Sequence, residues 1–180
     1  MRVLGIDPGS IVCGYGVVEK NGSVITLVEY GVVEAKKRFE SLPQRLEMIY
    51  TRLGSVIERA LPDEAAVESV FFAKNAQSLA KLSHARGVAM LAATVKQIPI
   101  LEYSAKEVKR SVTGNGNASK EQVQFMVRTM LKIEETPGFF DATDALATAI
   151  CHCLKRNSPR GAARSWKQFI EDNPKRLLQK

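Results

Sequence analysis

The apolar run that opens the chain constrains the fold more than any other feature, because it ends in a carboxylate. Residues 3–6 read VLGI, a pattern typical of a buried strand, and Asp7 follows at once. Burying a lone ionised carboxylate is costly unless a cation or strong hydrogen-bond donors compensate. Pro8 and Gly9 then end the strand and let the backbone turn. Asp7 therefore either caps this turn through its own backbone or binds a partner that the rest of the chain supplies.

Strand and helix patterns follow in an order that predicts an alternating architecture. Apolar and polar residues alternate over 13–35 on both sides of Asn21-Gly22, a dipeptide that favours a tight hairpin turn, so three antiparallel strands are expected first. Ser41 and Gln44 have the spacing of a capping box at the start of a helix. Further patterns predict strands over 64–72 and 98–103, and helices over 42–57, 75–96, 104–112, 119–132 and 141–154.

This order predicts an α/β fold with a mixed five-stranded sheet flanked by helices on both faces, and it resembles the ribonuclease H-like fold. A chain of 180 residues with 45% hydrophobic content suffices for one compact domain with a real core. We assign this domain to residues 1–154. Residues 155–180 contain Pro, Gly, Ser and Arg in proportions typical of a linker, so we expect a basic C-terminal tail of disorder-prone composition.

Cysteine usage and hydropathy exclude several classes of protein. The three cysteines, Cys13, Cys151 and Cys153, are odd in number and lack paired-ligand spacing, so we expect buried thiols and neither a disulfide framework nor a zinc site. The sequence has no run of about 18 apolar residues and no secretory signal pattern. We therefore expect a cytoplasmic protein that has no membrane partner.

Basic charge is concentrated in two parts of the chain. The formal net charge is +7, and residues 69–133 carry 10 basic and 3 acidic residues, while residues 155–180 carry 8 and 2. Residues 134–154 lie between them and contain 4 acidic residues and no Lys or Arg. A basic surface beside an acidic pocket is expected of a protein that binds a polyanion next to a metal site. The alternative is an ordinary solvated surface.

Four acidic residues are placed where folding could gather them. Asp7 and Glu68 each lie near the end of an apolar strand, and the two strands are expected to be neighbours. Asp141 and Asp144 lie one turn apart at the start of a predicted helix, where they could instead serve as a cap and a dipole-stabilising residue. If the four converge, divalent cations must separate them, and oxygen ligands select Mg²⁺ or Mn²⁺. Two such ions about 4 Å apart can clamp a phosphodiester, which predicts a hydrolytic nuclease site.

Residues between these acids could hold nucleic acid. The stretch VFFAKN places two aromatics just after Glu68, and an exposed phenylalanine there could stack on an unpaired base, although both could also be buried. Lys120 follows a Gly/Asn loop and is expected near the scissile phosphate. The basic residues expected to meet a phosphate backbone are Lys74, Lys81, Arg86, Lys106, Lys109, Arg110 and Lys120.

These motifs together resemble the RuvC family of Holliday junction resolvases over about residues 3–154. The matching stretches are GIDPGS with GYGVV, LPQRL, VESVFFAKNAQSLAKLSHARGVAMLAA, EYSAKEVKRSVTGNGNASKEQV and DATDALATAICH. Some family members carry a histidine at the position of Asp141, and alanine often stands where this chain has Thr143. Neither departure puts the site in doubt.

The resemblance implies a magnesium-dependent endonuclease that resolves four-way DNA junctions in recombination and repair. It implies a homodimer that nicks two like-polarity strands symmetrically and leaves 5′-phosphate and 3′-hydroxyl ends, with the branch-migration proteins RuvA and RuvB as partners. Lys109 and Lys120 are implied as DNA-contacting or catalytic lysines, and Phe71 as the aromatic placed against bases. The implied tetrad, holding two Mg²⁺ per subunit with Mn²⁺ as a substitute, is Asp7, Glu68, Asp141 and Asp144.

Three other interpretations stay open on the sequence. The motif GIDPGS also resembles the phosphate loop of an actin-like ATPase or sugar kinase, but those folds need two lobes. A smaller YqgF-like nuclease shares the expected fold and acts on other nucleic acid. A non-catalytic DNA-binding module is the third, and four convergent acids argue against it because they repel DNA in the absence of metal.

Overall fold

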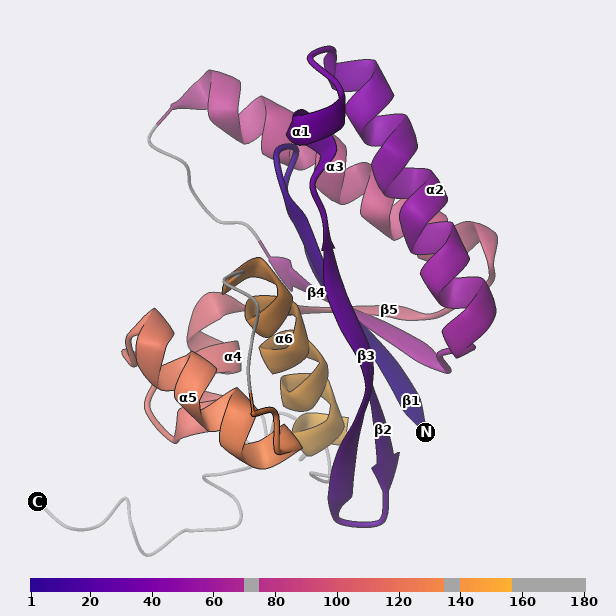
Figure 1. The fold of residues 1–180 in the computed structure, drawn as a ribbon. Coiled ribbons are helices and arrows are strands. Elements are labelled where there is room, and N and C mark those ends of the chain that lie inside the picture. Colours follow the sequence, from indigo (N-terminus) through magenta and orange to yellow (C-terminus); the bar gives the residue numbers. More distant parts are fainter. Residues whose placement is uncertain (70–74, 135–139, 157–180) are drawn as a thin grey trace, which may run out of the picture.

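Figure 1 shows the computed structural model of the chain, in which residues 1–69, 75–134 and 140–156 are described. At its centre is a five-stranded sheet with the strand order β3-β2-β1-β4-β5. The first three strands form an antiparallel meander, β4 runs parallel to β1, and β5 runs parallel to β4, which confirms the predicted mixed sheet. The strands are β1 (Arg2–Asp7), β2 (Cys13–Asn21), β3 (Val24–Val33), β4 (Glu64–Ser69) and β5 (Ile100–Ser104).

Helices cover both faces of this sheet, as the sequence predicts (Figure 1). α2 and α3 pack together over one face, and α4, α5 and α6 cover the other. The four-residue helix α1 was not predicted, because so short a segment shows no apolar periodicity. The helices are α1 (Ala35–Arg38), α2 (Leu42–Ala60), α3 (Ala76–Val95), α4 (Ala105–Thr113), α5 (Lys120–Leu131) and α6 (Phe140–Arg156).

The central strand β1 contributes side chains to both layers of the core. Leu4 and Ile6 are fully buried against α2 and α3, whereas Val3 is buried on the side of α6. Successive strand residues point to opposite faces, so the alternate positions of β1 after Val3 are Gly5 and Asp7, which also face α6. The carboxylate at the end of β1 is therefore directed toward the helix that carries Asp144.

Two helices begin with a full capping box, and the one box predicted above is absent. Ser104 forms a full capping box at the start of α4, and Ser119 does so at the start of α5. The box predicted for Ser41 and Gln44 is wrong. Ser41 does stand at the N-cap of α2, but its hydroxyl donates to the Gln44 side chain at 2.8 Å and accepts no backbone N–H.

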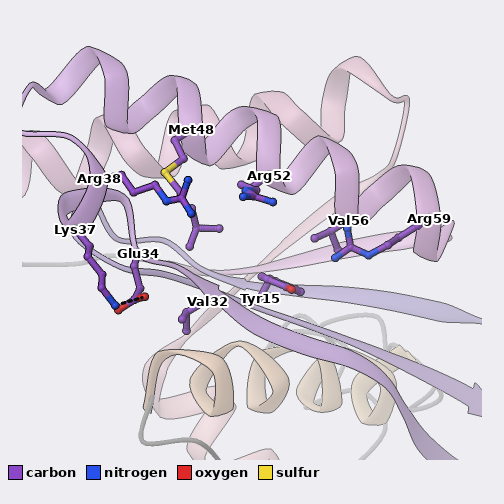
Figure 2. Close-up of a pocket in the computed structure, with 10 residues that line it drawn as sticks. Tyr15, Val32, Glu34, Lys37, Arg38, Met48, Arg52, Val56 and Arg59 are labelled. Carbon is purple, nitrogen blue, oxygen red and sulfur yellow. Dashed lines mark hydrogen bonds and ion pairs between the residues drawn. The ribbon is translucent and has the colours of Figure 1, made fainter.

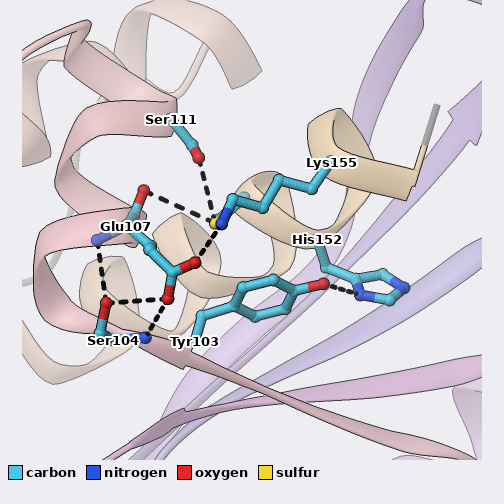
Figure 3. A network of polar contacts seen from close by, with 7 residues as sticks. Tyr103, Ser104, Glu107, Ser111, His152 and Lys155 are labelled. Atoms are coloured by element: carbon cyan, nitrogen blue, oxygen red, sulfur yellow. Dashed lines mark hydrogen bonds and ion pairs between the residues drawn. The ribbon is translucent and has the colours of Figure 1, made fainter. Parts of the chain in front are cut away.

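A polar network fixes the C-terminal end of α6 to the sheet and to α4 (Figure 3). The ring of His152 is fully buried, with Nδ1 2.8 Å from the Tyr103 hydroxyl and Nε2 against the Glu64 carboxylate. Lys155 pairs with Glu107 on α4. Helix α6 extends two residues beyond its predicted end at residue 154, and these contacts stabilise its last turn.

The cysteines are buried and unpaired, as expected from their number and spacing. Burial raises the pKa of the Cys13 thiol to about 12, so this thiol stays protonated and inert at neutral pH. Within the described ranges, none of the helices combines the length and the apolar character needed to cross a bilayer.

Candidate functional site

Two glycines let the backbone of α6 pack directly against the backbone of the sheet. A Cβ atom at Gly5 would lie 2.0 Å from the carbonyl oxygen of Ala145, and one at Gly14 would lie 2.0 Å from that of Asp141. A glycine inside a strand is typical of such close approach between backbones. Gly14 is also the cross-strand partner of Asp7. The start of α6 is therefore held next to the end of β1.

Three of the four predicted carboxylates line one pocket of about 240 Å³ at this edge of the sheet. Ile6 pairs with Val67, so the residues that follow them, Asp7 and Glu68, end neighbouring parallel strands on the same face. Asp144 reaches the pocket from α6. The other residues that line it are Ala105, Val108, Lys109, Lys120 and Val123, from α4 and α5.

The fourth carboxylate, Asp141, lies in the first turn of α6 and is half-buried, but it is not among the residues that line the pocket. Its charge still acts on the site, since it helps to raise the pKa of Asp7. The structure thus brings Asp7, Glu68 and Asp144 together and places Asp141 beside them.

Burial dominates the electrostatics of Asp7. Desolvation, and after it the charges of Asp144, Glu68 and Asp141, together raise its pKa to about 8, against the opposing effect of Lys120. Without a bound cation, Asp7 is therefore largely protonated at neutral pH. A carboxyl group so perturbed, in a cleft with other acids, is typical of a functional site.

Two lysines offset the negative charge of the pocket. Desolvation and the charge of Asp144 raise the pKa of Glu68, while Lys120 and Lys109 lower it. Lys120 Nζ lies 3.0 Å from Asp144 Oδ2, and this hydrogen bond raises the pKa of Lys120. Lys120 is therefore a cation already held at the carboxylate cluster.

The described ranges contain no group of three or more His, Cys, Asp or Glu side chains that is close enough to hold a metal ion as it stands. Carboxylates that repel one another do not draw together without a cation between them, and here Asp144 pairs with Lys120. The donor set nevertheless suits a hard divalent ion, because the described residues that line the pocket present carboxylate oxygens and no sulfur or imidazole.

The predicted DNA contacts fall in different places. Lys109 lines the carboxylate pocket. Arg86 already has partners within the protein. Its guanidinium group pairs with Glu102, and its Nε donates a hydrogen bond of 3.4 Å to the backbone carbonyl of Glu68. Lys81 is exposed on α3, on the other side of the sheet. Arg110 and Lys106 are exposed on α4, while Phe71 and Lys74 lie outside the described residues.

The sequence analysis missed the apolar wall of the pocket and the two glycines that let α6 pack closely against the sheet. Ala105, Val108 and Val123 form that wall and desolvate the carboxylates. These residues looked like ordinary core positions of two amphipathic helices. Gly5 and Gly14 could have been found, because a glycine within a strand pattern indicates close backbone approach.

Comparison with known proteins identifies the family. The family model described as crossover junction endodeoxyribonuclease RuvC matches residues 3–152. The chain belongs to the RuvC family. RuvC of Cytophaga hutchinsonii is 43% identical over 175 residues, covering 97% of this chain and 87% of the relative. RuvC of Bacteroides fragilis is 46% identical over 180 residues, covering 97% and 95%.

Solved structures agree with this assignment. T. thermophilus RuvC in complex with a Holliday junction substrate superposes with a TM-score of 0.81 at 34% identity, covering 87% of this chain and 94% of that one. The yeast mitochondrial Holliday junction resolvase Ydc2, with a TM-score of 0.61 and 13% identity, shares the fold. The ribonuclease H-like fold predicted from the sequence is confirmed. Membership of the RuvC family also decides against the ATPase and YqgF-like alternatives.

Proposed function

We propose that this protein cuts four-way DNA junctions at the pocket formed by Asp7, Glu68 and Asp144, as a crossover junction endodeoxyribonuclease that acts in recombination and repair. The observation that carries the proposal is the convergence of three separate carboxylates on one partly apolar pocket that also holds Lys109 and Lys120. A non-catalytic DNA-binding module would gain nothing from acids buried at its DNA surface.

Metal dependence is expected of a RuvC-family nuclease, and the pocket offers ligands for it. Asp7, Glu68, Asp141 and Asp144 would hold two Mg²⁺ ions, with Mn²⁺ as a substitute. When bound, such ions activate a water and stabilise the departing 3′ oxygen of a phosphodiester. The ammonium group of Lys120 lies at the mouth of the cluster, where it would attract the scissile phosphate.

The apolar residues around the acids have a separate role in this proposal. Val108 and Val123 are both buried, and both line the pocket that holds the carboxylates. They limit the water around the site, which strengthens the attraction between the phosphate and the lysines because the local dielectric is low. Lys109, which also lines the pocket, would contact the strand next to the scissile phosphate.

We further propose a cytoplasmic homodimer that nicks two like-polarity strands symmetrically, leaves 5′-phosphate and 3′-hydroxyl ends, and works with RuvA and RuvB. Support for a dimer comes from α3, where Leu91 and Val95 are 51% and 55% exposed. Such apolar side chains on one helix are expected to be covered by a second protein surface. Additional DNA contacts are proposed for Phe71, Lys74, Lys81 and Arg86.

The proposal is tested with an end-labelled four-way junction and a linear duplex of the same sequence. With Mg²⁺, the protein should cut the junction in paired nicks at symmetric positions, and DNA ligase should reseal the products. With excess EDTA it should bind the junction without cutting it. Equal cutting of the linear duplex would contradict junction selectivity, and cutting in EDTA would contradict the metal requirement.

The pKa of Asp7 predicts how the metal requirement depends on pH. With a metal-free pKa of about 8, Asp7 must lose a proton when a cation binds, so protons compete with the metal below that pH. We expect the Mg²⁺ concentration for half-maximal cleavage to fall by up to about tenfold per unit between about pH 6.5 and 8 and then to level off. The half-maximal Mg²⁺ concentration is measured, and not the cleavage rate alone, because hydroxide can change the rate without changing the affinity for Mg²⁺. A constant Mg²⁺ requirement over this range would contradict the prediction.

A further inference from the structure

A second cavity, of about 480 Å³, lies on the face of the sheet opposite to the carboxylate pocket (Figure 2). Strands β2 and β3 form one wall, α2 forms the facing wall, and α1 closes one end. Its volume lies within the range of about 300–1,000 Å³ that is usual for small-ligand sites. It shares no lining residue with the carboxylate pocket.

The lining of this cavity is strongly basic. Among the described residues that line it, Glu34 alone is acidic, and it pairs with Lys37 at 3.3 Å. The charge of Arg59 is also neutralised, because its Nε lies 2.9 Å from Oε2 of Glu29 on β3. The basic residues that line the cavity are Lys37, Arg38, Arg52 and Arg59.

Two guanidinium groups that line the cavity have no protein partner among the described residues. Within the described part of the chain, neither Arg38 nor Arg52 makes an ion pair or a side-chain hydrogen bond, and both are exposed. They come from separate helices, α1 and α2, yet both line the same cavity, as Figure 2 shows. Both guanidinium groups line the same cavity, so both would attract an anion bound there. The planar fork of arginine suits two oxygens of a phosphate.

The remaining walls offer an apolar surface. Tyr15 on β2 and Met48 on α2 are half-buried, Val56 is buried, and all three line the cavity beside the arginines. Tyrosine and methionine pack well against flat rings. The cavity therefore combines guanidinium groups for an anion with an apolar surface for an uncharged ring.

We propose that this cavity binds a phosphate ester, with Arg38 and Arg52 on the phosphate oxygens and Tyr15 and Met48 against the organic part. The ester comes either from a free nucleotide or from a nucleic-acid strand, and both present the same chemistry to the two arginines. Binding here does not depend on the proposed chemistry of the carboxylate pocket, so failure of either proposal leaves the other standing.

The binding test uses the full chain with its methionines labelled with ¹³C in the methyl group, in EDTA. Met48 lines the cavity, so its methyl resonance reports binding there and not at the carboxylate pocket. The probes are ADP and a single-stranded oligonucleotide of about 12 nucleotides. We expect a saturable shift of the Met48 resonance. A shift with ADP alone indicates a free nucleotide, and a shift with the oligonucleotide alone indicates a nucleic-acid strand. No shift with either probe would overturn the proposal.

Variants test whether the arginines are responsible. Arg38→Gln with Arg52→Gln should weaken the affinity reported by Met48 by at least about tenfold. The melting temperature should stay unchanged, because neither side chain pairs with another residue that the structure describes. Lys36→Gln is the matched control, since Lys36 lies on α1 and is exposed but does not line the cavity. This control should bind both probes like the parent protein. Retained affinity in the arginine variant, or equal loss in the control, would contradict the assignment.

Discussion

Replacing Asp7 by asparagine is expected to lower the rate of junction cleavage by at least about a thousandfold, while binding of the junction in EDTA stays within a fewfold of the parent. Asp7 is the carboxylate on which the charges of Asp144, Glu68 and Asp141 all act, so it stands at the centre of the cluster. Asparagine keeps its shape but supplies neither the charge nor the second oxygen ligand. Single-turnover cleavage of a labelled junction and a gel-shift assay in EDTA measure the two quantities.

The same substitution should stabilise the protein when metal is absent. The pKa of Asp7 is about 8 in the folded state, against 3.8 for an ordinary aspartate, so the folded state holds a proton that the unfolded chain releases between these values. The stability contributed by that proton is present below about pH 4 and is lost as the pH rises through 8. At about pH 8 in EDTA, we expect Asp7→Asn to be more stable than the parent by about 1–3 kcal/mol, measured by urea unfolding.

Glu47→Gln is the matched control for this variant, because Glu47 is exposed on α2 and away from the carboxylate pocket. It should cut junctions at the parent rate. Parent-like cleavage by Asp7→Asn would show that the reaction takes place elsewhere. Loss of cleavage accompanied by loss of stability in EDTA would show that Asp7 serves the fold and not the reaction.

Replacing Gly14 by alanine is expected to damage both the fold and the site. The added Cβ would lie 2.0 Å from the carbonyl oxygen and 2.4 Å from the carbonyl carbon of Asp141, and both are backbone atoms that cannot rotate away. The start of α6 must then shift by about 1 Å, which costs about 2–4 kcal/mol of stability. A displacement of that size also separates Asp141 and Asp144 from Asp7, so cleavage should fall by at least about a hundredfold.

Gly54→Ala separates this steric effect from a general effect of alanine. Gly54 lies inside α2, and a Cβ there would meet nothing within 4 Å. The control should gain about 0.5–1 kcal/mol, because alanine favours helix more than glycine does, and it should cut at the parent rate. Cleavage is measured at a temperature where circular dichroism shows the variants folded. Parent-like melting and cleavage by Gly14→Ala would contradict the close approach of α6.

Local patterns predicted most of the helices and strands of this protein and the carboxylates of its proposed site. The hairpin at Asn21-Gly22 follows from turn chemistry, and α4 begins at Ser104 because its side chain caps the helix. The expectation that Asp7 and Glu68 would meet also came from the sequence, since both end apolar runs that fit adjacent parallel strands. Family resemblance then supplied the roles of the residues that local patterns leave undecided.

Only the tertiary structure decided how the helices and strands lie relative to one another, because no local pattern specifies this. Only the packing of α6 against Gly5 and Gly14 brings Asp144 to the strand ends, and only the placement of α5 brings Lys120 within 3.0 Å of that carboxylate. The shift of the pKa of Asp7 to about 8 likewise depends on burial by residues from distant parts of the chain. Sequence patterns report propensity and periodicity over a few turns, whereas desolvation and charge coupling depend on distances that exist only after the chain has folded.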